Sequence, residues 1–151
     1  MSICMVGSDP MSTKAFLDTA HAIALSSAKD QFHVRAIALA EQMEAARTRL
    51  VTTRAVLLEI GNALSKLRYR QAAVKLLDSL EADPTVEIVP LSEGLYARAA
   101  KLYRERTDKE WGLTDCISIL VMQDRGLTDA LTTDGHFQQA GFRALLREGF
   151  S

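Results

Sequence analysis

The chain has 151 residues, of which 48% are hydrophobic and 25% are charged, and its net charge at pH 7 is −1. This balance suits one globular domain with one core, and the lack of a strong positive charge argues against binding of long duplexes by a broad basic surface. No apolar run reaches the roughly 18 residues that a membrane span needs. The two cysteines, Cys4 and Cys116, show no metal-binding spacing, which suits a reducing, cytoplasmic setting.

The first twelve residues differ from the rest of the chain, because regular patterning begins only at Thr13. They lack the basic start and long apolar centre of a signal peptide. We expect residues 1–12 to form a disordered leader and residues 13–151 to form a single domain.

From Thr13 onward, short apolar runs typical of buried strands alternate with longer segments of helical period. In chain order we expect a strand at 14–19, helices at 20–27 and 30–47, a strand at 50–53, helices at 54–67 and 71–80, a strand at 86–91, helices at 92–106 and from 113 to a glycine cap at 126, a strand at 130–133, a helical turn at 136–140 and a fifth strand at 142–146. No hairpin signal appears. This order predicts an α/β fold, with a parallel sheet of four to five strands and helices on both faces.

The helix that begins near residue 113 is apolar on nearly every face, which indicates that neighbours pack against it on several sides. Its first turn nevertheless carries Asp115, and Thr114 stands in a good N-cap position. An acid at a helix N-terminus stabilises the helix by about 0.3–1 kcal/mol, so Asp115 alone has an ordinary explanation.

Three other acids stand at related positions along the chain. Asp18 and Asp134 each follow an apolar strand, and Glu59 lies in the helix that follows a third strand. Ligands of open parallel sheets bind beyond the carboxyl ends of the strands, so these acids and Asp115 are expected to converge there. Each also has an ordinary reading: Asp18 as a turn cap, Asp134 with Gly135 as a turn, and Glu59 as a surface residue.

Convergence of four carboxylates has an electrostatic cost, since two of them about 4 Å apart repel by roughly 4 kcal/mol at an effective dielectric constant of 20. Such a cluster must take up protons, pair with basic side chains or hold a cation. The three histidines look isolated in the sequence, so an all-oxygen site for Mg²⁺ or Mn²⁺ is expected rather than a zinc site; they are His21, His33 and His136. The matching reaction is metal-assisted hydrolysis of a phosphodiester.

Four neutral polar residues are candidates to support these acids or to orient a substrate. Asn62 lies three residues after Glu59, on the same helical face. Thr19, Thr114 and Thr132 lie beside the other acids and are able to donate hydrogen bonds to carboxylates. Each of these residues serves equally well as a surface residue or as a partner of the local backbone.

Four segments together resemble the PIN-domain family, and more narrowly the VapC-type toxin nucleases of toxin–antitoxin modules. The segments are FLDT at 16–19, LEIGNAL at 58–64, WGLTDCIS at 111–118 and ALTTDGHF at 130–137. The resemblance covers residues 15–146 and implies a three-layer α/β/α fold. The acidic quartet of the family falls on the acids already named, Asp18, Glu59, Asp115 and Asp134.

The resemblance implies a Mg²⁺- or Mn²⁺-dependent endoribonuclease acting on single-stranded or looped RNA, a homodimer, and a cognate antitoxin protein that blocks the active site. Two positions depart from the common family pattern: Ala20, where a hydroxyl residue is frequent, and Gly135, where a bulkier residue is frequent.

Three other readings stay open from the sequence. The first is a non-toxin PIN nuclease of RNA processing, and the second is a signalling receiver domain. A receiver usually has an acidic pair after its first strand and a lysine near its last strand, and this chain shows neither. The third is a metal-free interaction module of the same fold.

Overall fold

The computed structural model describes residues 13–148, which form one five-stranded sheet whose strands are all parallel. The expected leader at residues 1–12 lies outside the described residues. The strands are β1 (Lys14–Leu17), β2 (Arg49–Thr53), β3 (Val86–Val89), β4 (Asp129–Leu131) and β5 (Arg143–Ala144). Their order across the sheet is β3-β2-β1-β4-β5.

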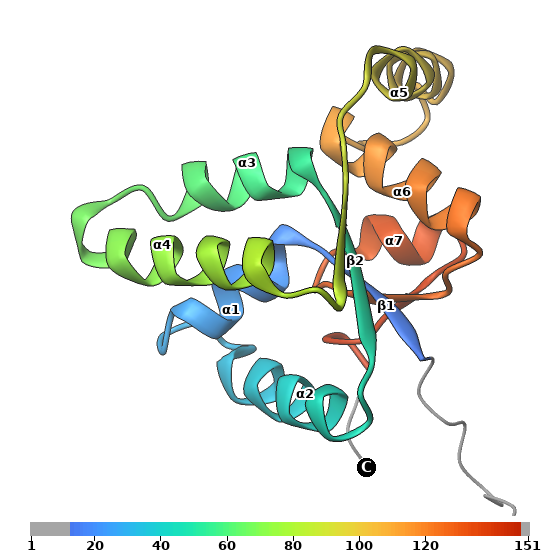
Figure 1. The fold of residues 1–151 in the computed structure, drawn as a ribbon. Coiled ribbons are helices and arrows are strands. Elements are labelled where there is room, and N and C mark those ends of the chain that lie inside the picture. The colour runs from blue at the N-terminus through green and yellow to red at the C-terminus, as the bar shows by residue number, and fades with distance from the viewer. Residues whose placement is uncertain (1–12, 149–151) are drawn as a thin grey trace, which may run out of the picture.

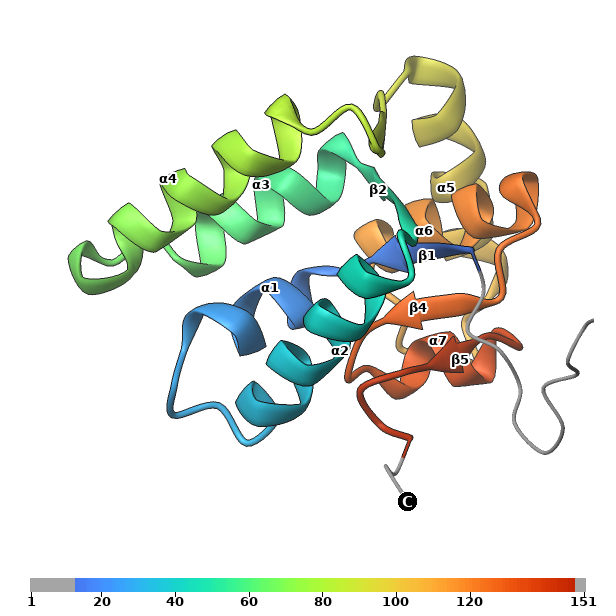
Figure 2. The ribbon, with the colours of Figure 1, turned by 60° about the horizontal axis from the view of Figure 1, so that its bottom comes forward.

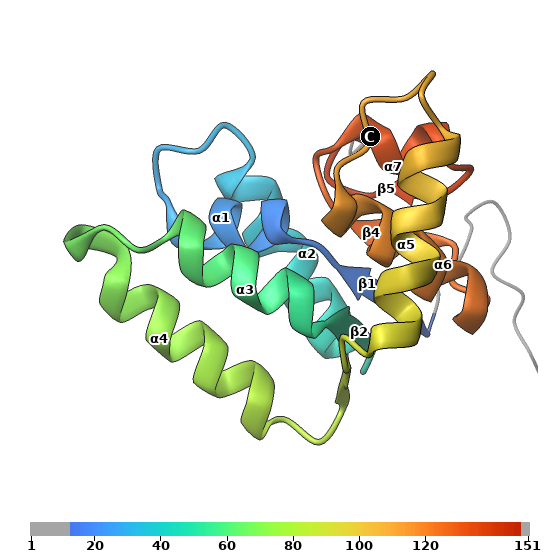
Figure 3. The same cartoon turned by 90° about the horizontal axis from the view of Figure 1, so that it is seen from above.

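Helices cover both faces of this sheet, as predicted (Figure 1). They are α1 (Thr19–Ser26), α2 (His33–Ala45), α3 (Arg54–Ala63), α4 (Leu67–Ala82), α5 (Glu93–Glu105), α6 (Leu113–Arg125) and α7 (Gly135–Gln139). Helices α1, α3 and α4 lie on one side of the strands, and α5, α6 and α7 lie on the other (Figure 3). Helix α2 packs against α1. Among residues 13–148, none of these helices combines the length and the apolar character needed to cross a membrane.

The strand order places a topological switch point between β1 and β4. The chain runs outward from β1 through β2 to β3 and then returns to the other side of β1, where β4 and β5 are added (Figure 2). Phe16 in β1 pairs with Ala130 in β4, so the carboxyl ends of the two strands lie side by side. The helices that follow β1 and β4 leave toward opposite faces, and ligands of doubly wound sheets bind at such a point.

The core lies on both sides of β1 and β4, which are almost completely buried. The rings of Phe16 and Phe137 meet with their centroids 6.3 Å apart, joining β1 to α7. Helix α6 buries side chains around much of its circumference, as its sequence predicted; the buried ones are Cys116, Ile117, Ser118, Ile119, Val121 and Met122. This packing holds the N-terminus of α6 close to the switch point.

Several helix ends agree with the sequence and others do not; α3, for example, ends at Ala63 rather than at residue 67. Thr53 caps α3 by accepting a hydrogen bond from the amide of Val56, and Gly126 ends α6 in the left-handed conformation with φ of 65°. The expected N-cap at Thr114 is wrong, because Gly112 is the cap and α6 begins at Leu113, as the expected helix did. The expected turn at 68–70 is also wrong, because α4 already begins at Leu67.

His21 is a buried polar residue of α1. It is 2% exposed, and it lines a pocket of about 670 Å³ together with Met43, Leu76 and Leu80. Its Nδ1 atom has no hydrogen-bond partner among the described residues. Burial alone lowers the pKa of His21 from 6.5 to about 4, so the ring is neutral in the folded protein at pH 7.

The lowered pKa of His21 predicts a loss of stability in acid. Below pH 6.5 the unfolded chain takes up a proton that the folded protein refuses until about pH 4, so the contribution of His21 to stability is complete above pH 6.5 and falls on acidification. Between pH 8 and pH 5 the loss amounts to about 2 kcal/mol. Urea unfolding of the wild type and of His21→Leu at both pH values measures it, since the variant should lack this component. Parallel pH dependence of the two proteins would contradict it.

Candidate active site

Asp18 directly follows β1 and is the N-cap of α1. Its carboxylate is 6% exposed and accepts a hydrogen bond of 2.7 Å from the hydroxyl of Thr132, which follows β4. Burial raises the pKa of Asp18 from 3.8 to about 6, and the charge of Asp115 adds to that rise, while the Thr132 hydroxyl and the backbone amide of Thr19 oppose it. A buried carboxylate with a pKa this high is typical of functional sites.

Asp115 stands in the first turn of α6, where its side chain caps the backbone amide of Gly112. Its Oδ2 atom accepts a hydrogen bond of 3.0 Å from the backbone amide of Gly112. The same oxygen lies 3.0 Å from Nδ1 of His136. The negative charge of Asp115 also contributes to the raised pKa of Asp18, after the larger effect of burial.

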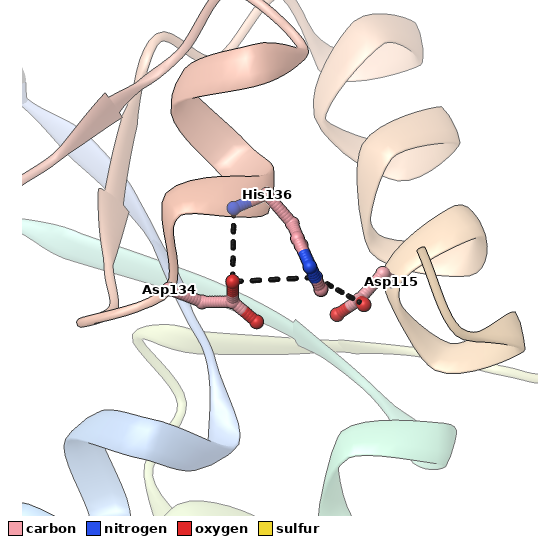
Figure 4. Close-up of side chains that lie close together, drawn as sticks. All are labelled: Asp115, Asp134 and His136. Carbon is pink, nitrogen blue, oxygen red and sulfur yellow. Dashed lines mark hydrogen bonds and ion pairs between the residues drawn. The ribbon is translucent and has the colours of Figure 1, made fainter. Parts of the chain in front are cut away.

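Asp134 is the N-cap of α7, and its Oδ1 atom accepts a hydrogen bond of 2.8 Å from the backbone amide of His136. Its own amide donates to the hydroxyl of Thr132 at 3.0 Å, so one hydroxyl connects Asp18 to Asp134. The Nδ1 atom of His136 lies 3.2 Å from Oδ1 of Asp134 (Figure 4). The imidazole ring thus lies between Asp115 and Asp134, which come from two different helices.

Glu59, in the middle of α3, lies nearer to solvent than the other three acids. Its Oε1 atom accepts a hydrogen bond of 2.8 Å from the hydroxyl of Thr19, the residue next to Asp18. Asn62 is exposed, and Thr114 is half-buried. Among the described residues, no hydrogen bond joins either of these two side chains to the acids. Their expected supporting roles therefore stay predictions, whereas Thr19 and Thr132 make the contacts that were expected of them.

Trp111 holds the loop before α6 against α7. Its ring is 6% exposed, and its Nε1 atom donates a hydrogen bond of 3.1 Å to Gln139. The guanidinium of Arg106 lies over the ring, 5.0 Å from its centroid. Because Gly112 follows Trp111 directly, this anchor sets the position of Asp115 relative to Asp134 and His136.

The donor atoms gathered here suit a divalent cation. Asp115, Asp134 and His136 each offer one ligand atom, and these atoms lie within 4.8 Å of one another. Asp18 is tied to this group through Thr132. Closely spaced carboxylates repel each other and are stabilised by a cation that they share. The structure thus brings together two of the four expected acids, Asp115 and Asp134. Thr132 joins Asp18 to the backbone amide of Asp134, and Thr19 donates a hydrogen bond to Glu59.

The expectation that no histidine would join the acids is wrong, because His136 contacts two of them. The contact between Asp134 and His136 could have been predicted from the sequence, because an acid at an N-cap lies next to residues of the first helical turn that follows it. The contact with Asp115 joins residues 21 positions apart and depends on how α6 and α7 pack together.

Comparisons with known proteins identify the family and the fold of the chain. The model of the PIN domain family matches residues 15–143. The fold is similar to that of Mycobacterium tuberculosis VapC20, a Sarcin-Ricin loop cleaving toxin, with 25% sequence identity, a TM-score of 0.74, and coverage of 85% of this chain and 96% of that one. It is also similar to FitAcB from Neisseria gonorrhoeae, with 20% identity, a TM-score of 0.59, and coverage of 86% and 95%. A search of curated proteins gave no match.

The double hydrogen bonding of Thr132 predicts a measurable effect on stability. Thr132→Val removes the hydroxyl and leaves the Asp18 carboxylate and the Asp134 amide without this partner. We expect the free energy of unfolding at pH 7.5 to fall by about 1–3 kcal/mol in urea titrations. Thr132→Ser keeps the hydroxyl and should lose less. Equal losses in the two variants would mean that the side-chain methyl group matters instead.

The raised pKa of Asp18 predicts that its charge destabilises the metal-free fold. The folded protein binds the proton of Asp18 more tightly than the unfolded chain does. The contribution of Asp18 to the free energy of unfolding therefore falls as the pH rises from about 4 through about 6. In chelator at pH 7.5, Asp18→Asn should therefore gain about 1–3 kcal/mol. Differential scanning calorimetry measures the change, with Asp124→Asn as the control, because Asp124 forms an exposed ion pair with Arg98. A less stable Asp18→Asn protein would contradict this account.

Proposed function

Because the chain belongs to the PIN domain family, we propose that it is a Mg²⁺- or Mn²⁺-dependent endoribonuclease that hydrolyses RNA phosphodiester bonds. The observation that carries this proposal is the close approach of Asp115, Asp134 and His136, together with the hydroxyl of Thr132 that joins Asp18 to the backbone amide of Asp134. These four acids are the residues that we propose to bind the metal and to carry the catalysis.

The side chains around the site are arranged to hold oxygen ligands in place. Asp18, Asp115 and Asp134 all stand at helix N-termini, whose partial positive charge stabilises anions. The bound divalent ion would supply stabilisation of charge on the phosphate and would lower the pKa of an attacking water. Without a cation, this group of acids repels the phosphates of an RNA backbone, which is why we propose metal dependence.

The partners of the chain are proposed from its similarity to VapC20, which is described as a Sarcin-Ricin loop cleaving toxin. We propose that the substrate is RNA, single-stranded or in a loop. We propose further that the chain is the toxin of a toxin–antitoxin pair, that a cognate antitoxin protein inhibits it, and that it acts in the cytoplasm as a homodimer. Because the net charge of the chain is −1, we propose that the site and its ion, rather than a broad basic surface, bind the RNA.

Cleavage of a labelled RNA with looped and single-stranded segments tests the activity. With Mn²⁺ or Mg²⁺ present, we expect cleavage by the wild type and a rate lower by on the order of 100-fold or more for Asp134→Asn, because the site loses one anionic ligand. Chelator should abolish cleavage by the wild type. Asp78→Asn is the matched control, since Asp78 is exposed on α4, and it should retain the wild-type rate. Equal cleavage by wild type and Asp134→Asn would refute the proposed site.

A further inference from the structure

We propose that His136 is a metal ligand through its Nδ1 atom, and that this nitrogen makes the site favour Mn²⁺ over Mg²⁺. The inference rests on the metal-dependent function proposed above and adds a residue outside the acidic quartet. It replaces the all-oxygen site that the sequence predicted with a mixed site of oxygens and one nitrogen.

The spacing of the three nearest donor atoms fits shared coordination. Nδ1 of His136 lies 3.0 Å from Oδ2 of Asp115 and 3.2 Å from Oδ1 of Asp134, and all three atoms lie within 4.8 Å of one another. Metal–ligand bonds of about 2.1 Å in an octahedral site place neighbouring ligand atoms about 3 Å apart. The imidazole nitrogen is therefore already at the separation from both carboxylates that a common ion requires.

The position of the ring is determined by local structure. His136 lies in the first turn of α7, and its backbone amide is bound to Oδ1 of Asp134 at 2.8 Å. The side chain is 28% exposed, and its ring points between the two carboxylates (Figure 4). The tautomer that carries its hydrogen on Nε2 presents the Nδ1 lone pair to a cation in this position.

The imidazole nitrogen explains why the site would prefer Mn²⁺ to Mg²⁺. Mg²⁺ selects oxygen ligands, whereas imidazole binds first-row transition metals well, and the three carboxylates of this site suit Mn²⁺. An imidazole in place of a water or a carboxylate therefore adds more to the binding of Mn²⁺ than to that of Mg²⁺. The same residue acting only as a hydrogen-bond partner of the acids would confer no such difference.

Metal binding to the full chain at pH 7.5 tests the inference without any measurement of cleavage. Mn²⁺ is titrated and free Mn²⁺ is read by electron paramagnetic resonance, while Mg²⁺ affinity is measured by competition. We expect tighter binding of Mn²⁺ than of Mg²⁺ by the wild type. In His136→Asn, Mn²⁺ affinity should fall by about tenfold or more, with a much smaller change for Mg²⁺. Electron spin echo envelope modulation of bound Mn²⁺ should show nitrogen coupling in the wild type that the variant lacks.

Two further variants serve as controls in this experiment. His33→Asn is the matched control, because His33 contacts the carbonyl of Ala24 outside the site, and it should keep the nitrogen coupling. His136→Gln, tested alongside, guards against misfolding of one variant. Binding of Mn²⁺ that depends on Asp134 but shows no nitrogen coupling, or an unchanged ratio of metal affinities in His136→Asn, would overturn the role of His136 and leave the proposed nuclease intact. Binding of Mn²⁺ that is absent, or unchanged in Asp134→Asn, would overturn both.

Discussion

The mutual repulsion of carboxylates gathered at one edge of the sheet is the constraint that shapes this structure. Asp18 shows the cost of holding a carboxylate at this edge, because burial, with a smaller effect from the charge of Asp115, raises its pKa to about 6. The fold offsets part of the cost with local donors: the Thr132 hydroxyl for Asp18, the Gly112 amide for Asp115 and the His136 amide for Asp134. The donors of Asp115 and Asp134 lie in the first turns of the helices that carry these acids, and the donor of Asp18 follows β4, the strand next to β1.

The topology of the sheet explains why acids so far apart in sequence meet at all. Strands β1 and β4 are neighbours although more than a hundred residues separate them, because the chain returns across β1 after it completes β3. The residues after both strands then reach the same edge. Helix α6 brings its N-terminus to this edge because Trp111 ties the preceding loop to α7 through Gln139.

The sequence predicted the class of fold, because it depends on local pattern, and the same kind of pattern is the basis for naming the four acids as candidates. Apolar runs that alternate with helical segments indicate a parallel sheet, and an acid directly after a strand lies at the ligand-binding edge whatever the strand order. The N-cap of α6 was less predictable, since Thr114 and Gly112 are both acceptable caps and the bond from the Gly112 amide to Asp115 favours Gly112. His136 was missed for a different reason: its contact with Asp115 depends on the packing of α6 against α7, which residue spacing does not reveal.

The same repulsion connects stability with metal binding. An ion that binds only the folded state stabilises it, and here it would also remove the unfavourable interaction between neighbouring negative charges. The donors that hold Asp18, Asp115 and Asp134 keep the acids in place before the ion arrives, so that little free energy is lost in arranging them when it binds. Burial is the main cause of the raised pKa of Asp18 and the charge of Asp115 a smaller one, so its donors leave part of the cost of ionising this carboxylate uncompensated. That remaining cost favours the arrival of a cation, and a chain that had neutralised it internally would bind the ion less well.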